Sequence, residues 1–184
     1  MDFILVFKFL LETFQREKID FALIGGFALQ AVGITRTTGD IDMLVLSENK
    51  EKIKDIMIKH NYKLIHESND VLNFYSEKFE LGRIDFLLAH RKYAVSMLKR
   101  AEERDVFKGE FKIKVIKIED QVGLKVQASS NDSSRMLKDM ADVEQLIKNN
   151  YSKLDMGLLR EYFRLFDRDA ELDKIIEKAK NVEQ

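Results

Sequence analysis

Gly25-Gly26 and Asp40-Ile-Asp42 are the two motifs that decide the fold of this chain. They lie in the stretch Phe21-Ala-Leu-Ile-Gly-Gly-Phe-Ala-Leu-Gln-Ala-Val-Gly-Ile-Thr-Arg-Thr-Thr-Gly-Asp-Ile-Asp-Met-Leu-Val-Leu46. The glycines separate an apolar, strand-like segment from a helical pattern. They would therefore let the backbone approach a phosphate at the N-terminus of that helix.

The two aspartates begin an apolar run rich in strand-forming residues. On a strand, Asp40 and Asp42 would project from the same face while Ile41 turns to the other. Two neighbouring carboxylates repel each other unless a cation lies between them. Hard oxygen ligands of this kind suit Mg²⁺, which commonly takes one or two carboxylates plus phosphate oxygens of a substrate.

A third carboxylate occurs in a later strand-like segment, Gly82-Arg-Ile-Asp-Phe-Leu-Leu-Ala89. Asp85 interrupts the apolar pattern there, because Ile84, Phe86 and Leu88 would all lie on the opposite face. Aspartate is depleted in strand interiors, so its presence in such a run favours a functional role over chance.

Together these motifs resemble the nucleotidyltransferase superfamily that shares its catalytic domain with DNA polymerase β. They are most similar to its bacterial branch of AbiEii-type toxins and small nucleotidyltransferases, over roughly residues 21–147. The family pattern is a strand, Gly-Gly or Gly-Ser, a helix, Asp-x-Asp on the next strand and a third acidic residue on a later one. A motif match of this kind is a hypothesis until its structural context is known.

The resemblance implies a metal-dependent enzyme that transfers NMP from an NTP to an acceptor hydroxyl. Asp40, Asp42 and Asp85 would be catalytic and would bind Mg²⁺ or Mn²⁺. Gly25 and Gly26 would form the phosphate-facing corner of the nucleotide site. This chain has Phe27 where relatives of the Gly-Ser type offer a hydroxyl, so backbone N–H groups would do more of the phosphate binding.

Two further groups of residues enter the predicted site. Arg36, Thr37 and Thr38 precede the acidic pair and would touch nucleotide phosphates, for which arginine is well suited; equally, Arg36 could be a solvated loop residue. By position in the family's downstream helical motif, Lys125 would contact the triphosphate and Asp139 would orient it or assist the attacking group.

A structural alternative exists for the helical pair. Arg135–Asp139 and Lys138–Asp142 are i,i+4 partners on a predicted helix, and such surface pairs contribute only about 0.2–0.5 kcal/mol each. The sequence leaves both interpretations open.

Composition describes an ordinary globular protein. The chain has 184 residues, 45% hydrophobic and 34% charged, with a net charge of -1, which fits one core with a helical appendage. It has no cysteine, so disulfides and thiolate chemistry are excluded, and three scattered histidines make a zinc site a poor hypothesis. The apolar N-terminus lacks the basic leader of a signal peptide and is too short to span a bilayer, so we expect a cytoplasmic protein without membrane contact.

Hydrophobic periodicity predicts an α+β fold, and the resemblance implies that its sheet is the mixed, helix-flanked sheet of the nucleotidyltransferases. We expect strands at 21–24, 41–46, 62–66, 71–75, 83–88 and 111–116, and helices at 3–16, 27–32, 48–60, 92–103, 119–129, 134–149, 155–166 and 170–182. Ser47 is the expected N-cap of the helix at 48–60. The predicted catalytic core is 1–117, with 118–184 as a helical subdomain packed on it.

The acceptor is less constrained than the site. AbiEii-like relatives act as toxins and some modify RNA ends, so RNA or tRNA is one acceptor, with an antitoxin protein as a further partner; small-molecule antibiotics and proteins are alternatives. Between residues 91 and 117 there are nine basic against four acidic residues, which would suit RNA phosphates or be a plain solvated surface. A catalytically silent binding module, docking a partner through the Phe-rich N-terminal helix, is the competing class.

Overall fold

The computed structural model describes residues 1–180. The chain divides into two compact units, Met1–Ile116 and Lys117–Gln184. Residues 181 and 182 of the helix expected at its end lie outside the described residues.

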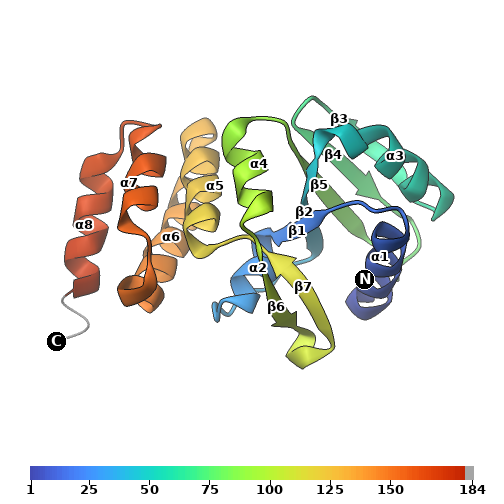
Figure 1. The fold of residues 1–184 in the computed structure, drawn as a ribbon, viewed down its shortest axis with the longest axis horizontal. Coiled ribbons are helices and arrows are strands. Elements are labelled where there is room, and N and C mark those ends of the chain that lie inside the picture. The colour runs from blue at the N-terminus through green and yellow to red at the C-terminus, as the bar shows by residue number, and fades with distance from the viewer. Residues whose placement is uncertain (181–184) are drawn as a thin grey trace. The chain divides into compact units, whose positions relative to one another are not determined.

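The first unit contains a mixed sheet. Over residues 1–180 the sheet has seven strands in the order β3-β4-β5-β2-β1-β7-β6 (Figure 1). The strands are β1 Phe21–Ile24, β2 Asp40–Leu46, β3 Lys63–Glu67, β4 Val71–Tyr75, β5 Arg83–Ala89, β6 Glu102–Val106 and β7 Phe111–Val115. β2 runs antiparallel to β1 and parallel to β5, at the centre of the sheet.

Alternation along β2 and β5 builds the core on one face of this sheet. Ile41 and Met43 of β2 and Ile84 and Phe86 of β5 are fully buried. They pack in one cluster with residues of α1 (Phe3–Arg16) and α3 (Lys50–Lys59). The predicted faces of β2 and β5 are thereby confirmed, and α1 has the bounds that its periodicity predicts.

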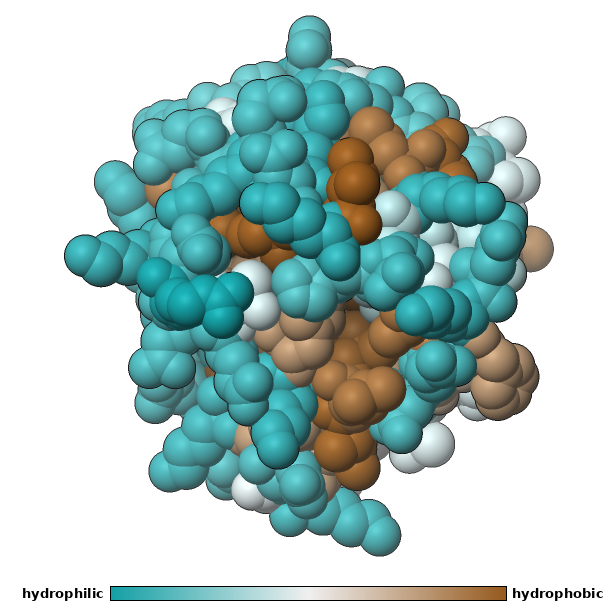
Figure 2. Space-filling model, turned by 90° about the vertical axis from the view of Figure 1, so that its right-hand side faces the viewer, coloured by the Kyte–Doolittle hydropathy of each residue, from teal (hydrophilic) through white to brown (hydrophobic). Residues whose placement is uncertain are grey.

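The phenylalanines of α1 belong to this core. Phe7 and Phe14 are fully buried, so the interpretation of the Phe-rich stripe as an exposed docking surface is wrong for them. Exposed apolar side chains of the first unit include Ile4 and Leu5, each 47% exposed, and Phe79 at 90%. Figure 2 shows brown apolar surface between teal polar surface on the face at the right of Figure 1.

β6 was not predicted. α4 (Lys92–Lys99) ends before residue 103, the expected end of that helix, and the charged segment Glu102–Val106 forms an edge strand. Its register with β7 places Glu103 opposite Lys114 and Asp105 opposite Lys112. Opposite charges directly across a strand pair stabilise the pairing, so pairing with the next strand along the chain overrides the helical preference of this segment.

Two local details of the first unit also differ from expectation. α2 (Gly25–Ala31) begins at the first glycine instead of at Phe27. Ser47 is not the N-cap of α3: residues Ser47–Asn49 form a 3-10 turn, and α3 begins at Lys50 without a side-chain cap.

The second unit is helical. It comprises α5 Ile118–Asn131, α6 Met136–Asn150, α7 Met156–Arg164 and α8 Asp169–Lys180. A Cβ on Gly123 of α5 would lie 2.8 Å from the Tyr162 ring of α7, so the missing side chain permits this close packing. An α+β chain with a helical C-terminal region is confirmed. None of the helices in residues 1–180 is both long enough and apolar enough to cross a membrane.

Candidate active site

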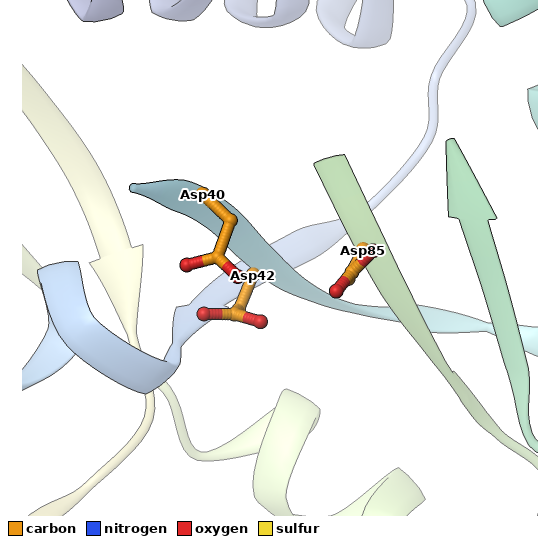
Figure 3. Close-up of side chains that lie close together, drawn as sticks. All are labelled: Asp40, Asp42 and Asp85. Atoms are coloured by element: carbon orange, nitrogen blue, oxygen red, sulfur yellow. The ribbon is translucent and has the colours of Figure 1, made fainter. Parts of the chain in front are cut away.

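Three carboxylates converge on the face of the sheet opposite the α1–α3 core. Asp40 and Asp42 lie two residues apart on β2, and the parallel register pairs Asp42 with Asp85 of β5. One oxygen of each carboxylate lies within 4.8 Å of the others (Figure 3). The predicted convergence is confirmed, and within residues 1–180 this is the group with the geometry of a metal site.

Burial and electrostatic repulsion both raise the pKa of Asp42, the central carboxylate of the cluster. Burial, and then the negative charges of Asp40 and Asp85, raise the pKa of Asp42 to about 7. The backbone N–H of Gly26 donates to Asp42, and the Arg83 guanidinium lies near it; both oppose that rise. Three clustered carboxylates fit a hard divalent cation as its oxygen ligands. The charge of the cation would offset the repulsion among them.

The glycine corner lies directly against this cluster. Gly25 has a φ of 64°, a conformation that favours glycine. A Cβ there would lie 2.1 Å from Oδ2 of Asp42, which no side chain tolerates. Gly25 therefore allows the backbone of the corner to approach a carboxylate in this protein, besides any phosphate.

Phe27, the residue after the corner, turns away from the carboxylates. It is 4% exposed, and its ring lies 4.8 Å from that of Phe3 and 5.2 Å from those of Phe7 and Phe107, centroid to centroid. Phe27 thus anchors α2 in the aromatic core and leaves the site free. The phenylalanine side chain at position 27 therefore does not obstruct the carboxylate cluster.

The loop before β2 brings one predicted residue into contact with the cluster. The Thr38 hydroxyl lies 3.0 Å from Oδ1 of Asp40. Thr37 is exposed, and the carbonyl of the half-buried Arg36 accepts a hydrogen bond from Gln30 at 2.6 Å. The nucleotide contacts predicted for Arg36, Thr37 and Thr38 stay predictions.

Arg83 belongs to the site and was missed from the sequence. Its Nε lies 3.0 and 3.1 Å from the two oxygens of Asp85, and its Nη2 lies 3.0 Å from Oδ2. This two-oxygen contact fixes the Asp85 carboxylate, as planar guanidinium groups do. The spacing could have revealed it, since residues 83 and 85 of one strand share a face.

The helical unit holds a second charged cluster. Lys125 Nζ lies 3.1 Å from Asp139 and 2.6 Å from Asp142, and Arg135 Nε lies 3.0 Å from Asp139. The side chain of Asp139 is 2% exposed and that of Lys125 13%. The i,i+4 pair Arg135–Asp139 is present as expected, whereas the contacts of Lys125, made across two helices, could not be derived from spacing along one. The catalytic roles of Lys125 and Asp139 stay predictions.

The basic stretch at 91–117 is partly neutralised. Lys112 and Lys114 face Asp105 and Glu103 across the β6–β7 pair, and Lys114 Nζ lies 2.6 Å from Asp20. The strand part of this stretch is therefore paired with acidic residues, which weakens the interpretation of it as an RNA-facing patch.

Comparison with solved structures identifies the class of protein to which this fold belongs. The fold is similar to that of the antibiotic-resistance factor ANT(2'')-Ia, with a TM-score of 0.64 at 13% identity over 95% of this chain and 97% of that one. It is also similar to the lincosamide adenylyltransferase LnuA, with a TM-score of 0.51 at 18% identity over 76% and 93%. For a putative nucleotidyltransferase of Thermotoga maritima the TM-score is 0.54 at 13% identity over 76% and 92%. At identities this low, the similarity shows that the chain has the nucleotidyltransferase fold and nothing finer.

The family follows from the sequence as a whole. Residues 8–183 match the family described as nucleotidyl transferase AbiEii toxin of type IV toxin–antitoxin systems, and the chain belongs to that family. None of the curated proteins matches the chain.

We predict that Asp42 makes the metal-free protein less stable as pH rises. Its folded pKa of about 7 lies above the ordinary aspartate value of 3.8, so between these values the folded state holds a proton that the unfolded state has lost. Stability should fall through this window by roughly 2–4 kcal/mol, at about 1.4 kcal/mol per pKa unit. Thermal unfolding from about pH 4 to pH 8 in EDTA measures it.

The matched variants are Asp42→Asn, which should remove this loss, and Asp55→Asn on the exposed face of α3, which should keep it. Equal pH profiles for the wild type and Asp42→Asn would contradict the prediction.

We also predict that Lys125→Met destabilises the helical unit. The change leaves two largely buried carboxylates without their shared cation, although Arg135 still contacts Asp139. The expected loss is about 3 kcal/mol, measured by urea unfolding, and Asp142→Asn should recover part of it in the double variant. Lys138→Met, at an exposed lysine of α6, should change stability by less than about 0.5 kcal/mol. A Lys125→Met protein as stable as this control would contradict the prediction that Lys125 stabilises the helical unit.

Proposed function

We propose that this protein transfers NMP from an NTP to an acceptor hydroxyl, with Mg²⁺ or Mn²⁺ held by Asp40, Asp42 and Asp85. The observation that carries the proposal is the convergence of these carboxylates within 4.8 Å on adjacent parallel strands. Membership of the nucleotidyltransferase family supports it.

The chemistry needs little from the protein beyond position and charge. A divalent cation bound there would favour ionisation of the acceptor hydroxyl and offset the charge growing on the α-phosphate and pyrophosphate. The ligands of the cation would be the carboxylates of Asp40 and Asp42, at the beginning of β2, and that of Asp85 on β5. Because Arg83 contacts both oxygens of Asp85, it keeps that carboxylate oriented.

The nucleotide would lie on the side of β2 that carries the glycine corner. The residues we propose for phosphate contacts are Gly25, Gly26, Arg36, Thr37 and Thr38, because the corner and the loop before β2 flank the acidic pair. We retain Lys125 as a triphosphate contact, together with Asp139, from their position in the family motif.

For the acceptor we propose an RNA hydroxyl, with tRNA as the first substrate to test. The support is the family description, which names a toxin of a type IV toxin–antitoxin system. The same description supports a cognate antitoxin as a biological partner. Antibiotics and proteins are the competing acceptors, and the experiment below separates them.

The prediction is that purified protein transfers label from one of the four α-labelled NTPs to tRNA in Mg²⁺, and does not do so in EDTA. Asp40→Asn and Asp85→Asn should each lower the rate by about 100-fold or more, since each removes a ligand of the cation whose charge would stabilise the transition state. Asp55→Asn, an identical chemical change at an exposed position of α3, should retain the wild-type rate.

Parallel reactions with aminoglycosides, lincosamides and a protein extract test the other acceptors. Label on a drug or protein, with none on tRNA, would overturn the RNA acceptor and keep the transferase. Transfer that persists in EDTA or in Asp85→Asn would overturn the metal-dependent mechanism.

A further inference from the structure

We propose that Thr38 is a positioning residue: its hydroxyl orients the Asp40 carboxylate as a metal ligand, and Gly26 must lack a side chain so that Thr38 can occupy this place. The inference rests on the proposed metal-dependent function. It concerns the loop before β2 and the corner before α2, which meet at the carboxylate cluster.

The hydroxyl of Thr38 contacts Asp40 twice. Its Oγ1 lies 3.0 Å from Oδ1 and 3.2 Å from the backbone carbonyl oxygen of Asp40. A hydroxyl has one hydrogen to donate, and an ionised carboxylate is the stronger acceptor. The bond to Oδ1 therefore fixes the rotation of the carboxylate that begins β2.

Gly26 provides the space that Thr38 uses. A Cβ on Gly26 would lie 2.5 Å from Cβ of Thr38 and 2.6 Å from its Oγ1. The nearest atom is not the end of a flexible chain but the branching carbon, which moves only with the backbone. Any residue with a Cβ at position 26 would therefore displace Thr38.

The two glycines thus serve the two aspartates of β2 separately. Gly25 makes room for the carboxylate of Asp42 directly, and Gly26 makes room for the threonine that holds Asp40. The Gly26 N–H in turn donates to Asp42. The corner is therefore packed against the acidic pair before any nucleotide arrives.

Threonine suits this role because it is β-branched. Its χ1 has few accessible rotamers, so a hydroxyl packed against Gly26 stays aimed at Asp40. The next residue is the exposed Gly39, which gives the loop no side-chain anchor of its own. Without the Thr38 bond, the beginning of β2 would lose the contact that fixes the carboxylate.

The test is Mn²⁺ affinity of the nucleotide-free protein, measured by electron paramagnetic resonance titration. Thr38→Val keeps the shape and removes the hydroxyl, and should weaken Mn²⁺ binding by about tenfold, as loss of partners behind metal ligands does. Thr38→Ser keeps the hydroxyl and should bind within about twofold of the wild type. Thr35→Val, at an exposed threonine of the same loop, is the matched control and should bind as the wild type does.

A second variant protects the test against a folding defect in Thr38→Val. Gly26→Ala retains the Thr38 hydroxyl but moves it away from Asp40, and should also weaken Mn²⁺ binding. Alanine retains the backbone N–H that donates to Asp42, so both changes act through the bond from Thr38 to Asp40, and the double variant should bind about as weakly as either single variant. Losses that multiply would overturn the proposed route through Thr38.

The remaining outcomes separate this inference from the proposed function. Wild-type Mn²⁺ affinity in Thr38→Val, with a raised KM for the NTP, would overturn the positioning role and leave Thr38 a nucleotide contact only. A wild-type protein that binds no Mn²⁺ and transfers no label would overturn both this inference and the proposed function.

Discussion

Mutual repulsion among three carboxylates is the constraint on which the rest of this site depends. The parallel pairing of β2 with β5 places Asp42 beside Asp85, and the alternation of β2 adds Asp40 on the same face. Burial, and then the negative charges of Asp40 and Asp85, raise the pKa of Asp42 to about 7. A protein that assembles such a group accepts a cost in stability, which a bound cation would offset.

The surrounding residues share the work of holding these charges in place. Arg83 contacts Asp85, Thr38 contacts Asp40, and the Gly26 N–H donates to Asp42, so each carboxylate has its own hydrogen-bonding partner. The turn at Gly25 and Gly26 separates two environments. Its glycines face the charged cluster while the following Phe27 enters the aromatic core, which fixes the corner to the scaffold.

Much of this arrangement followed from local pattern. Alternation placed Asp40 and Asp42 on one face of a strand and Asp85 on the polar face of another, because the side-chain period of a strand is two. What failed were features made by contacts between elements. β6 pairs with β7, the next strand along the chain, and Lys125 contacts Asp142 on another helix. The periodicity of a single segment shows neither partner.

The sequence alone determined which residues form the proposed site: two glycines, a pair of aspartates two apart and a third in a later strand, each identified by a short-range spacing. Only the tertiary structure decided how they meet. The register that pairs Asp42 with Asp85 and the packing of Thr38 on Gly26 depend on segments that are separated in the chain. Strand register is set by burial of a whole face, so it follows from the packing of the core and not from any one motif.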